Sequence, residues 1–163
     1  MIEDMILNSD EMHEQRLSNT DTLDFLCFTL GKEEFGVDLN LISQIIIVPP
    51  ITPVPRTRSY FMGVISVRGE IVTVVDFRQL IGLEPATIKK STRILLFNTG
   101  DEQFGLMVDS VTFVRKVSFE MFEENPALEE TPVTDKIIGI IRTDDKCQIT
   151  VIDLDDIMNE AVR

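Results

Sequence analysis

The side chains best suited to covalent chemistry in this sequence are one histidine and two cysteines. His13 stands in a polar stretch near the N-terminus. Cys27 and Cys147 lie in apolar, strand-like segments and form no CxxC pair. A Ser or Cys nucleophile needs a base within hydrogen-bonding reach, and the position of His13 predicts no such pair. Two buried free thiols are the favoured interpretation, and a disulfide is the alternative that the sequence leaves open.

Phosphate-binding and metal-binding motifs are also missing from the sequence. The eight glycines are scattered, and neither GxxxxGK nor GxGxxG occurs. A single histidine offers no metal-ligand spacing. The acidic run of Asp153, Asp155 and Asp156 lacks the glycine and the terminal glutamate of a calcium loop. We therefore predict a protein that is not an enzyme and that carries no cofactor and no metal.

Asp76 is the carboxylate whose position most suggests a chemical role, because it follows an apolar strand, where phospho-accepting aspartates occur. Asp153 occupies the equivalent place after a similar segment near the C-terminus. Two aspartates in equivalent places are better explained as helix N-caps, whose side chains accept hydrogen bonds from the first helical N–H groups. By the same argument, Asn40 is predicted to cap a single helical turn through Leu41 and Ile42.

The charge is strongly negative overall and unevenly distributed. The formal net charge is −13, from 15 basic and 28 acidic residues. This balance argues against binding to nucleic acid or to an anionic membrane through bulk charge. Residues 56–93 nevertheless carry a net charge of +4, so the remainder sums to −17. Solvated loops and a polarised surface that orients a partner are both compatible with this pattern.

The segment Gly63–Leu83, GVISVRGEIVTVVDFRQLIGL, is the one around which the chain is organised. The run Ile71–Val75 is β-branched throughout and predicts a strand that is buried on both faces. Arg68 and Gly69 precede it as a turn, in which Gly69 supplies the positive φ. After Asp76 the apolar residues fall at helical spacing, which predicts a short helix.

Two halves of the chain repeat this organisation. Glu33–Val37 (EEFGV) recurs 69 residues later as EQFGL, and Thr73–Phe77 (TVVDF) recurs 77 residues later as TVIDL. Motifs that recur in the same order indicate a duplication. Many short strands in each half predict two small antiparallel barrels that share a core, because one barrel of about 60 residues would be only marginally stable.

The domain organisation follows from these segments. Residues 1–21 are predicted to be an acidic, flexible N-terminal extension, either disordered or a loosely docked arm, and residues 22–163 to form a single domain. Within it, one barrel is expected mainly from residues 22–84, the other mainly from 92–152, and a closing helix from 153–162. No window approaches the roughly 18 apolar residues of a membrane span. The acidic N-terminus is unlike a secretory signal, so a cytoplasmic protein is predicted.

The order of motifs resembles that of the CheW family, the coupling proteins of bacterial chemotaxis. The similarity is carried by FTLGKEEFGVDLNLISQII, PITPVP, GVISVRGEIVTVVDFRQLIG and IIGIIRTDDKCQITVIDLDDIM, and it covers roughly residues 23–158. The resemblance implies two intertwined five-stranded, SH3-like barrels related by pseudo-two-fold symmetry, with short helices and a C-terminal helix. That architecture agrees with the repeat found in the residues themselves.

The resemblance also implies a function in signal transduction by protein–protein interaction, as an adaptor in a two-component system. CheW-like proteins join the cytoplasmic tips of methyl-accepting chemoreceptors to the regulatory domain of the histidine kinase CheA. They do so in arrays at the inner face of the membrane, without inserting into it. The receptor is expected in a groove between the barrels near the motif arginine, here Arg68. Val67, Gly69, Gln44 and Arg58 complete the predicted partner-binding residues.

Arg68 also has a plain structural explanation, because an exposed turn arginine is often solvated or paired with a neighbour such as Glu70. Three positions depart from the usual family pattern: Gln44, where the family often has Glu, and Arg58 and Thr73, where it often has Pro. Gln44 removes a charge from a region that the family uses for partners. The identity of the partners is therefore less firmly indicated than the fold.

Two alternatives remain at the level of sequence. The nearer one is the CheW-like portion of a CheV-type protein, which also carries a phosphorylatable receiver domain. The more distant one is a nucleic-acid-binding protein of small barrels. The acidic total, with only Tyr60 and no tryptophan for base stacking, argues against the latter.

Overall fold

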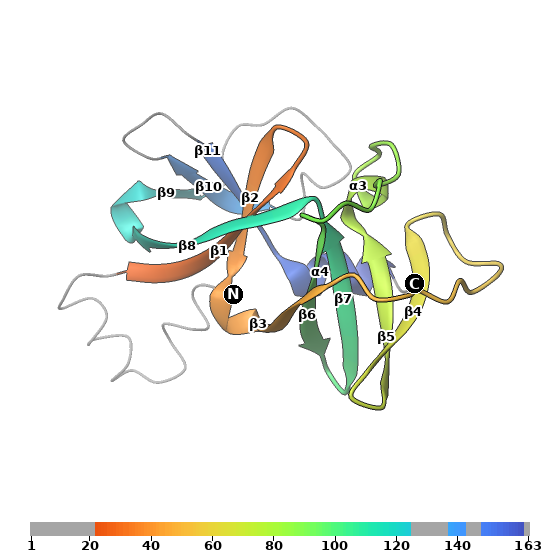
Figure 1. Ribbon diagram of the computed structural model, residues 1–163. Helices are drawn as coiled ribbons and strands as arrows, with labels where there is room; N and C mark the ends of the chain where they lie inside the picture. The colour runs from red at the N-terminus through yellow and green to blue at the C-terminus, as the bar shows by residue number, and fades with distance from the viewer. Residues whose placement is uncertain (1–21, 125–136, 143–147, 162–163) are drawn as a thin grey trace.

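The computed structural model describes residues 22–124, 137–142 and 148–161 (Figure 1). The predicted extension 1–21 and the second cysteine, Cys147, lie outside these residues. The first half contains β1 (Thr22–Leu30), β2 (Glu33–Asp38), the 3₁₀ turn η1 (Leu39–Leu41), β3 (Ile42–Ile47), β4 (Phe61–Val67), β5 (Glu70–Asp76) and α3 (Phe77–Leu80). The second half contains β6 (Arg93–Thr99), β7 (Glu102–Val108), β8 (Ser110–Ser118), η2 (Phe119–Met121), β9 (Phe122–Glu124), β10 (Ile137–Arg142), β11 (Gln148–Ile152) and α4 (Leu154–Ala161).

These strands form two sheets that repeat one topology. The six-stranded sheet has the order β8-β1-β2-β11-β10-β9, and the five-stranded sheet has the order β3-β6-β7-β5-β4. Matching the two orders equates β8 with β3, β1 with β6, β2 with β7, β11 with β5 and β10 with β4. The short strand β9 is the addition that gives one sheet a sixth strand. The predicted all-β fold of two small barrels with short helices is confirmed.

The two halves of the chain exchange strands. β1 and β2 of the first half pair with β8 and β11 of the second, while β3 pairs with β6 and β5 pairs with β7. Each sheet is thus the first hairpin of one repeat plus the later strands of the other. Residues 22–84 and 92–152 mark the repeats, but the hydrogen bonding does not divide the barrels there. The sequence pattern shows that the chain is duplicated, but it does not show which repeat supplies each strand of a barrel.

Three apolar clusters explain why the strands are so uniformly apolar. One cluster, which includes Phe25 and Val151, belongs to the six-stranded sheet, and a second, which includes Val72 and Ile94, belongs to the five-stranded sheet. The third and largest combines residues of both sheets and both helices. Successive residues of a strand point to opposite faces, so the central strands contribute alternately to a barrel interior and to this shared core. The predicted shared core is confirmed.

Two equivalent edge strands carry the same irregularity. The pairing of β3 with β6 and of β8 with β1 shifts register at a β-bulge. In one bulge the hydroxyl of Ser43 donates to the carbonyl of Leu96, and in the other the hydroxyl of Thr112 donates to the carbonyl of Cys27, both at 3.0 Å. Leu96 and Cys27 are 69 positions apart, the offset of the repeat. The bulge is therefore part of the duplicated design and fixes where each edge strand bends.

Two equivalent glycines in β4 and β10 permit close approach of the neighbouring segment. A Cβ atom on Gly63 would lie 2.1 Å from the carbonyl oxygen of Thr52, and a Cβ on Gly139 would lie 2.6 Å from that of Glu123. Gly63 also has a φ of 136°. Backbone hydrogen bonds between Thr52 and Val64 hold the neighbouring segment in place, so it cannot move away without losing them.

We expect Gly63→Ala to lower the free energy of unfolding by about 3 kcal/mol or more, because the new methyl group meets backbone that is fixed by hydrogen bonds. Gly100→Ala is the matched control, since Gly100 also has a positive φ of 62° but has no atom within 4 Å of the added Cβ. The control should lose about 1 kcal/mol from its backbone conformation alone. Urea unfolding of both variants measures the difference, and equal losses would contradict the role of close packing.

Candidate partner-binding site

The predicted arginine stands at the tip of the β4–β5 hairpin. Val67 pairs with Glu70, which leaves Arg68 and Gly69 as a two-residue turn. Their φ values are 51° and 84°, the left-handed pair of a type I′ turn. The positive φ predicted for Gly69 is confirmed, while that of Arg68 was not anticipated. Both residues are exposed, so the guanidinium of Arg68 is presented to solvent at the tip of a rigid hairpin.

An exposed isoleucine accompanies Arg68 at this tip. Ile71 is 68% exposed, although the sequence predicted a strand buried on both faces. Val72 and Val74 are fully buried in the barrel interior, as expected, and Thr73 is half-buried. Ile71 and Thr73 lie on the outer face of the sheet, which the shared core covers only from Val75 onward. The prediction was therefore wrong for the first part of the strand, and an apolar side chain is left beside the cationic turn.

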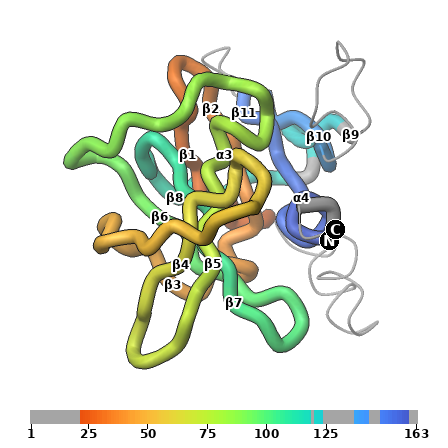
Figure 2. The backbone as a smooth tube through the Cα atoms, turned by 90° about the vertical axis from the view of Figure 1, so that its right-hand side faces the viewer, coloured from red at the N-terminus to blue at the C-terminus, as the bar shows by residue number. Residues whose placement is uncertain are grey.

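The two hairpins of the five-stranded sheet end on the same side. β5 and β7 run parallel, so the β4–β5 and β6–β7 turns lie at one end of the molecule, where they project together in Figures 1 and 2. Val67, the predicted residue before the turn, is half-buried and packs against the interior of this barrel. It supports the hairpin and leaves Arg68 as the accessible member of the motif.

Gln44 and Arg58 lie in other parts of the same half. Gln44 is half-buried in the edge strand β3, opposite Leu96, on the face that lines the barrel interior. Arg58 is exposed in the connection from β3 to β4, and its guanidinium donates to the hydroxyl of Tyr60 at 2.9 Å. β3 and β4 are the first and last strands in the order of their sheet, yet Ile46 of β3 packs on the same buried cluster as Val67. The predicted residues thus belong to one barrel and do not form a single contact cluster.

The basic segment 56–93 separates into structural and accessible cations. Arg78 and Arg93 are half-buried and bonded within the protein, Arg93 donating to the carbonyls of Lys90 and Thr92. The remaining five side chains are exposed: Arg56, Arg58, Arg68, Lys89 and Lys90. The accessible positive charge of the segment is therefore carried by its turns and linkers.

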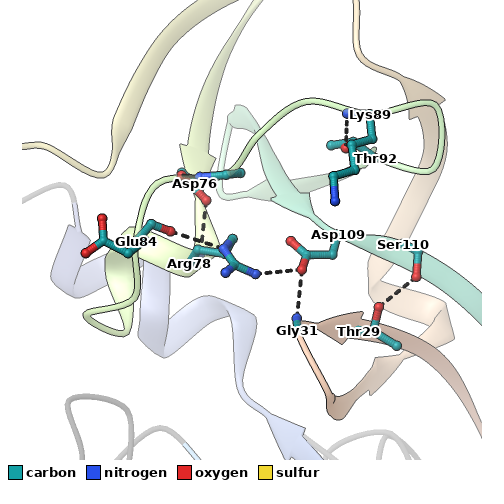
Figure 3. Close-up of polar contacts among 10 residues, drawn as sticks. Thr29, Gly31, Asp76, Arg78, Glu84, Lys89, Thr92, Asp109 and Ser110 are labelled. Atoms are coloured by element: carbon teal, nitrogen blue, oxygen red, sulfur yellow. Dashed lines mark hydrogen bonds and ion pairs between the residues drawn. The ribbon is translucent and has the colours of Figure 1, made fainter.

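Arg78 forms a clamp that sequence reasoning missed. Its guanidinium donates to Asp109 at 2.6 Å and to the carbonyl of Glu84 at 3.1 Å, and Asp109 also accepts from the backbone N–H of Gly31 at 2.7 Å (Figure 3). Asp109 is the single residue between β7 and β8, so the clamp joins this crossover to the β1–β2 turn and to the helix α3. A pocket of about 200 Å³ beside it is lined by hydroxyl groups and by Lys89. Because Arg78 and Asp109 are separated by 31 positions, no local pattern could have revealed their pairing.

Asp76 is buried, and its carboxylate caps the N-terminus of α3. One carboxylate oxygen accepts from the N–H of Arg78, and the other accepts from the Gln79 side chain and the N–H of Ala86, at 3.0–3.3 Å. Asp153 likewise accepts from the N–H of Asp156 at 3.2 Å. The interpretation of both residues as N-caps is confirmed. The cap predicted at Asn40 was wrong, because the side chain of Asp38 accepts from the N–H of Asn40 and caps η1 instead.

The first cysteine is free and buried in β1. Burial and the carboxylate of Glu34 raise the pKa of the Cys27 thiol to about 11, against a smaller lowering by Arg115. At neutral pH the thiol is therefore protonated, which makes it a poor nucleophile. Within the described ranges, no three His, Cys, Asp or Glu side chains are grouped as a metal site would require. The described helices include none that is long and apolar enough to span a membrane.

A scan of protein families matches residues 24–162 to the family described as CheW-like domain. The chain belongs to that family. The chemotaxis protein CheW of Thermotoga maritima is 32% identical over 139 residues, covering 83% of this chain and 87% of the relative. The scaffolding protein TtCheW of Thermoanaerobacter tengcongensis superposes with a TM-score of 0.75 at 27% identity, covering 83% of this chain and 86% of that one.

A CheV protein is a more distant relative of this CheW-like domain. CheV3 of Helicobacter pylori is 22% identical over 154 residues, which is 89% of this chain but only 49% of CheV3. The shared CheW-like domain therefore accounts for about half of that protein. Family membership makes this chain a chemotaxis scaffold protein.

We expect Arg68→Asn to raise the free energy of unfolding by about 0.5–1 kcal/mol, because Asn-Gly is the preferred pair for a type I′ turn and asparagine tolerates left-handed backbone. Urea denaturation with the wild-type chain as reference measures the gain. A loss of stability would mean that the Arg68 side chain itself supports the hairpin.

We expect Asp76→Asn to lower the free energy of unfolding by about 2–3 kcal/mol, because an amide NH₂ would face donors that now reach a carboxylate oxygen in a buried site. Asp153→Asn is the matched control at the equivalent cap, which is only half-buried, and asparagine is itself a good N-cap. The control should lose no more than about 0.5 kcal/mol. Equal losses in thermal unfolding would show that burial of Asp76 is not the cause.

Proposed function

We propose that this protein is a non-catalytic chemotaxis adaptor that couples the cytoplasmic tips of chemoreceptors to the regulatory domain of the histidine kinase CheA. It acts in the cytoplasm, within signalling arrays at the inner face of the membrane. The single observation that carries the proposal is the β4–β5 hairpin tip, where Arg68 and Ile71 stand exposed in a CheW-like domain. A cation beside an apolar side chain on a rigid turn is typical of a protein-binding hot spot.

The chemistry of the tip fits a helical receptor partner. A guanidinium donates several hydrogen bonds in a fixed geometry, so Arg68 suits a carboxylate or the free carbonyls of a helix. The Ile71 side chain supplies apolar area that gains free energy only when a partner covers it. Gly69 has no atom within 4 Å of a hypothetical Cβ, so its role is conformational and leaves room for a partner.

A binding mechanism is also supported by what the buried polar groups do. Asp76 and Asp38 cap short helices, and Thr92 accepts from the N–H of Lys89. These three are the buried polar side chains of the described ranges, and each is engaged in the structure. The shared core holds the two barrels in one arrangement. Such a rigid body can fix kinase and receptor relative to one another, so that a change in the receptor biases the kinase equilibrium.

The alternative of a CheV-type protein is favoured by one observation, the match to CheV3. It would place the same domain beside a phosphorylatable receiver. A complete reading frame that encodes such a receiver would favour this alternative, and both hypotheses assign the same binding role to the CheW-like domain.

We expect Arg68→Glu to weaken binding to a receptor signalling tip by about 1–3 kcal/mol, roughly 5- to 150-fold in Kd, with unchanged folding. Lys90→Glu is the matched control, because it makes the same charge change at another exposed position of the basic segment. Separate titrations against a receptor tip and against a CheA regulatory domain distinguish the partners. Equal weakening by both variants would indicate bulk charge, and no binding of the wild-type chain to either partner would refute the proposal.

A further inference from the structure

The edge strand β8 exposes a surface that the fold itself leaves uncovered. β8 is the first strand in the order of the six-stranded sheet and pairs only with β1 among the described strands (Figure 1). Phe113 is 40% exposed and Val114 is 50% exposed. An apolar edge strand is a liability for a soluble domain unless something covers it.

Both faces of this edge strand are cationic as well as apolar, because Phe113 and Arg115 point to one face and Val114 and Lys116 to the other. The guanidinium carbon of Arg115 lies 4.9 Å from the centre of the Phe113 ring, and Lys116 is the next residue. The Nε atom of Arg115 is buried and has no acceptor. Lys116 is 3.4 Å from Asp24, but both side chains are largely exposed, so that ion pair contributes little. A carboxylate from outside the sheet would offset the positive charge of Arg115 and Lys116.

The equivalent strand β3 provides an internal contrast. Val114 pairs with Leu26 and Ile45 pairs with Leu95, and the two partners are 69 positions apart, the offset of the repeat. Ile46 and Ile47 therefore stand where β8 has Arg115 and Lys116. Both edges expose apolar side chains, but only β8 adds positive charge. An acidic occupant would distinguish β8 from β3.

The chain carries an acidic segment next to this edge. Residues 1–21 contain six carboxylates and one arginine, and they include the apolar residues Ile2, Met5 and Ile6 at helical spacing. The segment joins β1 at Thr22, which pairs with Ser118, while Arg115 pairs with Phe25 three positions along the strand. Three strand positions span about 10 Å, and 21 residues can reach much farther. This tether gives the segment a high effective concentration at β8.

We propose that residues 1–21 of the same chain dock on β8, with their carboxylates on Arg115 and Lys116 and their apolar side chains on Phe113 and Val114. The acidic segment then acts as a built-in cover of this edge. A partner that uses β8 must displace it, whereas the β4–β5 hairpin tip stays accessible. The inference concerns a different surface from the proposed receptor site and does not depend on it.

Photo-crosslinking of the full-length chain tests the proposal. A benzoylphenylalanine at position 114 should crosslink to peptides from residues 1–21, and the same group at position 45 of the equivalent strand should do so at least fivefold less. An equimolar mixture of unlabelled and ¹⁵N-labelled chains shows whether a crosslink lies within one molecule. Crosslinks between chains would mean that a second copy covers β8, and this outcome, equal yields at both positions or no crosslink would overturn the proposal.

The role of charge is tested in the segment, where substitution leaves the described sheets intact. Replacing Glu3, Asp4, Asp10, Glu11 and Glu14 by their amides should reduce the yield at position 114 at least threefold. Lys116→Gln, at an exposed position, should also reduce the yield at position 114 with the thermal unfolding temperature unchanged. Yields that remain constant in the segment variant would show that the carboxylates do not hold it on β8.

Discussion

Neither barrel can bury the outer faces of its own central strands, and the rest of the structure depends on this constraint. β1, β6 and β7 carry buried apolar side chains on both faces, and one face of each of these strands and of β2 belongs to the core shared with the other barrel. Sixteen buried residues within the described ranges form the shared core. At about 1.5–3 kcal/mol for each large side chain, they outweigh the surface-accessible Arg78–Asp109 pair, worth roughly 1 kcal/mol. Packing sets how the barrels sit together, and the clamp secures the crossover between them.

The exchange of strands strengthens this constraint. The chain passes between the sheets at η1 in one repeat and at Asp109 in the other, so the two repeats cannot separate without unpairing whole strands. A protein that transmits a signal by fixing the geometry of its partners benefits from such a body, because a partner's displacement is passed on and not absorbed. The Cys27 thiol in β1 is buried and protonated at neutral pH, so it contributes to the packing of this rigid interior.

Much of the fold could be predicted from the sequence, because the repeated motifs coincide with the positions of strongest local constraint. In both TVVDF and TVIDL, an aspartate follows a buried strand and accepts hydrogen bonds from the first helical N–H groups. The caps at Asp76 and Asp153 could therefore be predicted from the sequence. The cap of η1 was misassigned because Asp38 and Asn40 are both good caps, and only the backbone decides between them. Contacts between residues that are distant in the chain, such as Arg78 and Asp109, cannot be predicted from a local sequence pattern.

In the candidate site, too, the local turn could be predicted from the sequence, whereas the exposure that depends on tertiary packing could not. Arg68-Gly69 between apolar runs is a hairpin signal, and its turn geometry follows from two residues alone. The exposure of Ile71 depends instead on where the shared core ends, which the strand pattern of five β-branched residues does not reveal. In the proposed function, this exposed side chain is the apolar part of the surface that a partner would cover. Ile71 lies outside the core, in a strand that begins beside the left-handed turn of Arg68, and most of its side chain is in contact with solvent. A partner that covers Ile71 in the proposed function would remove this apolar area from water and so gain binding free energy.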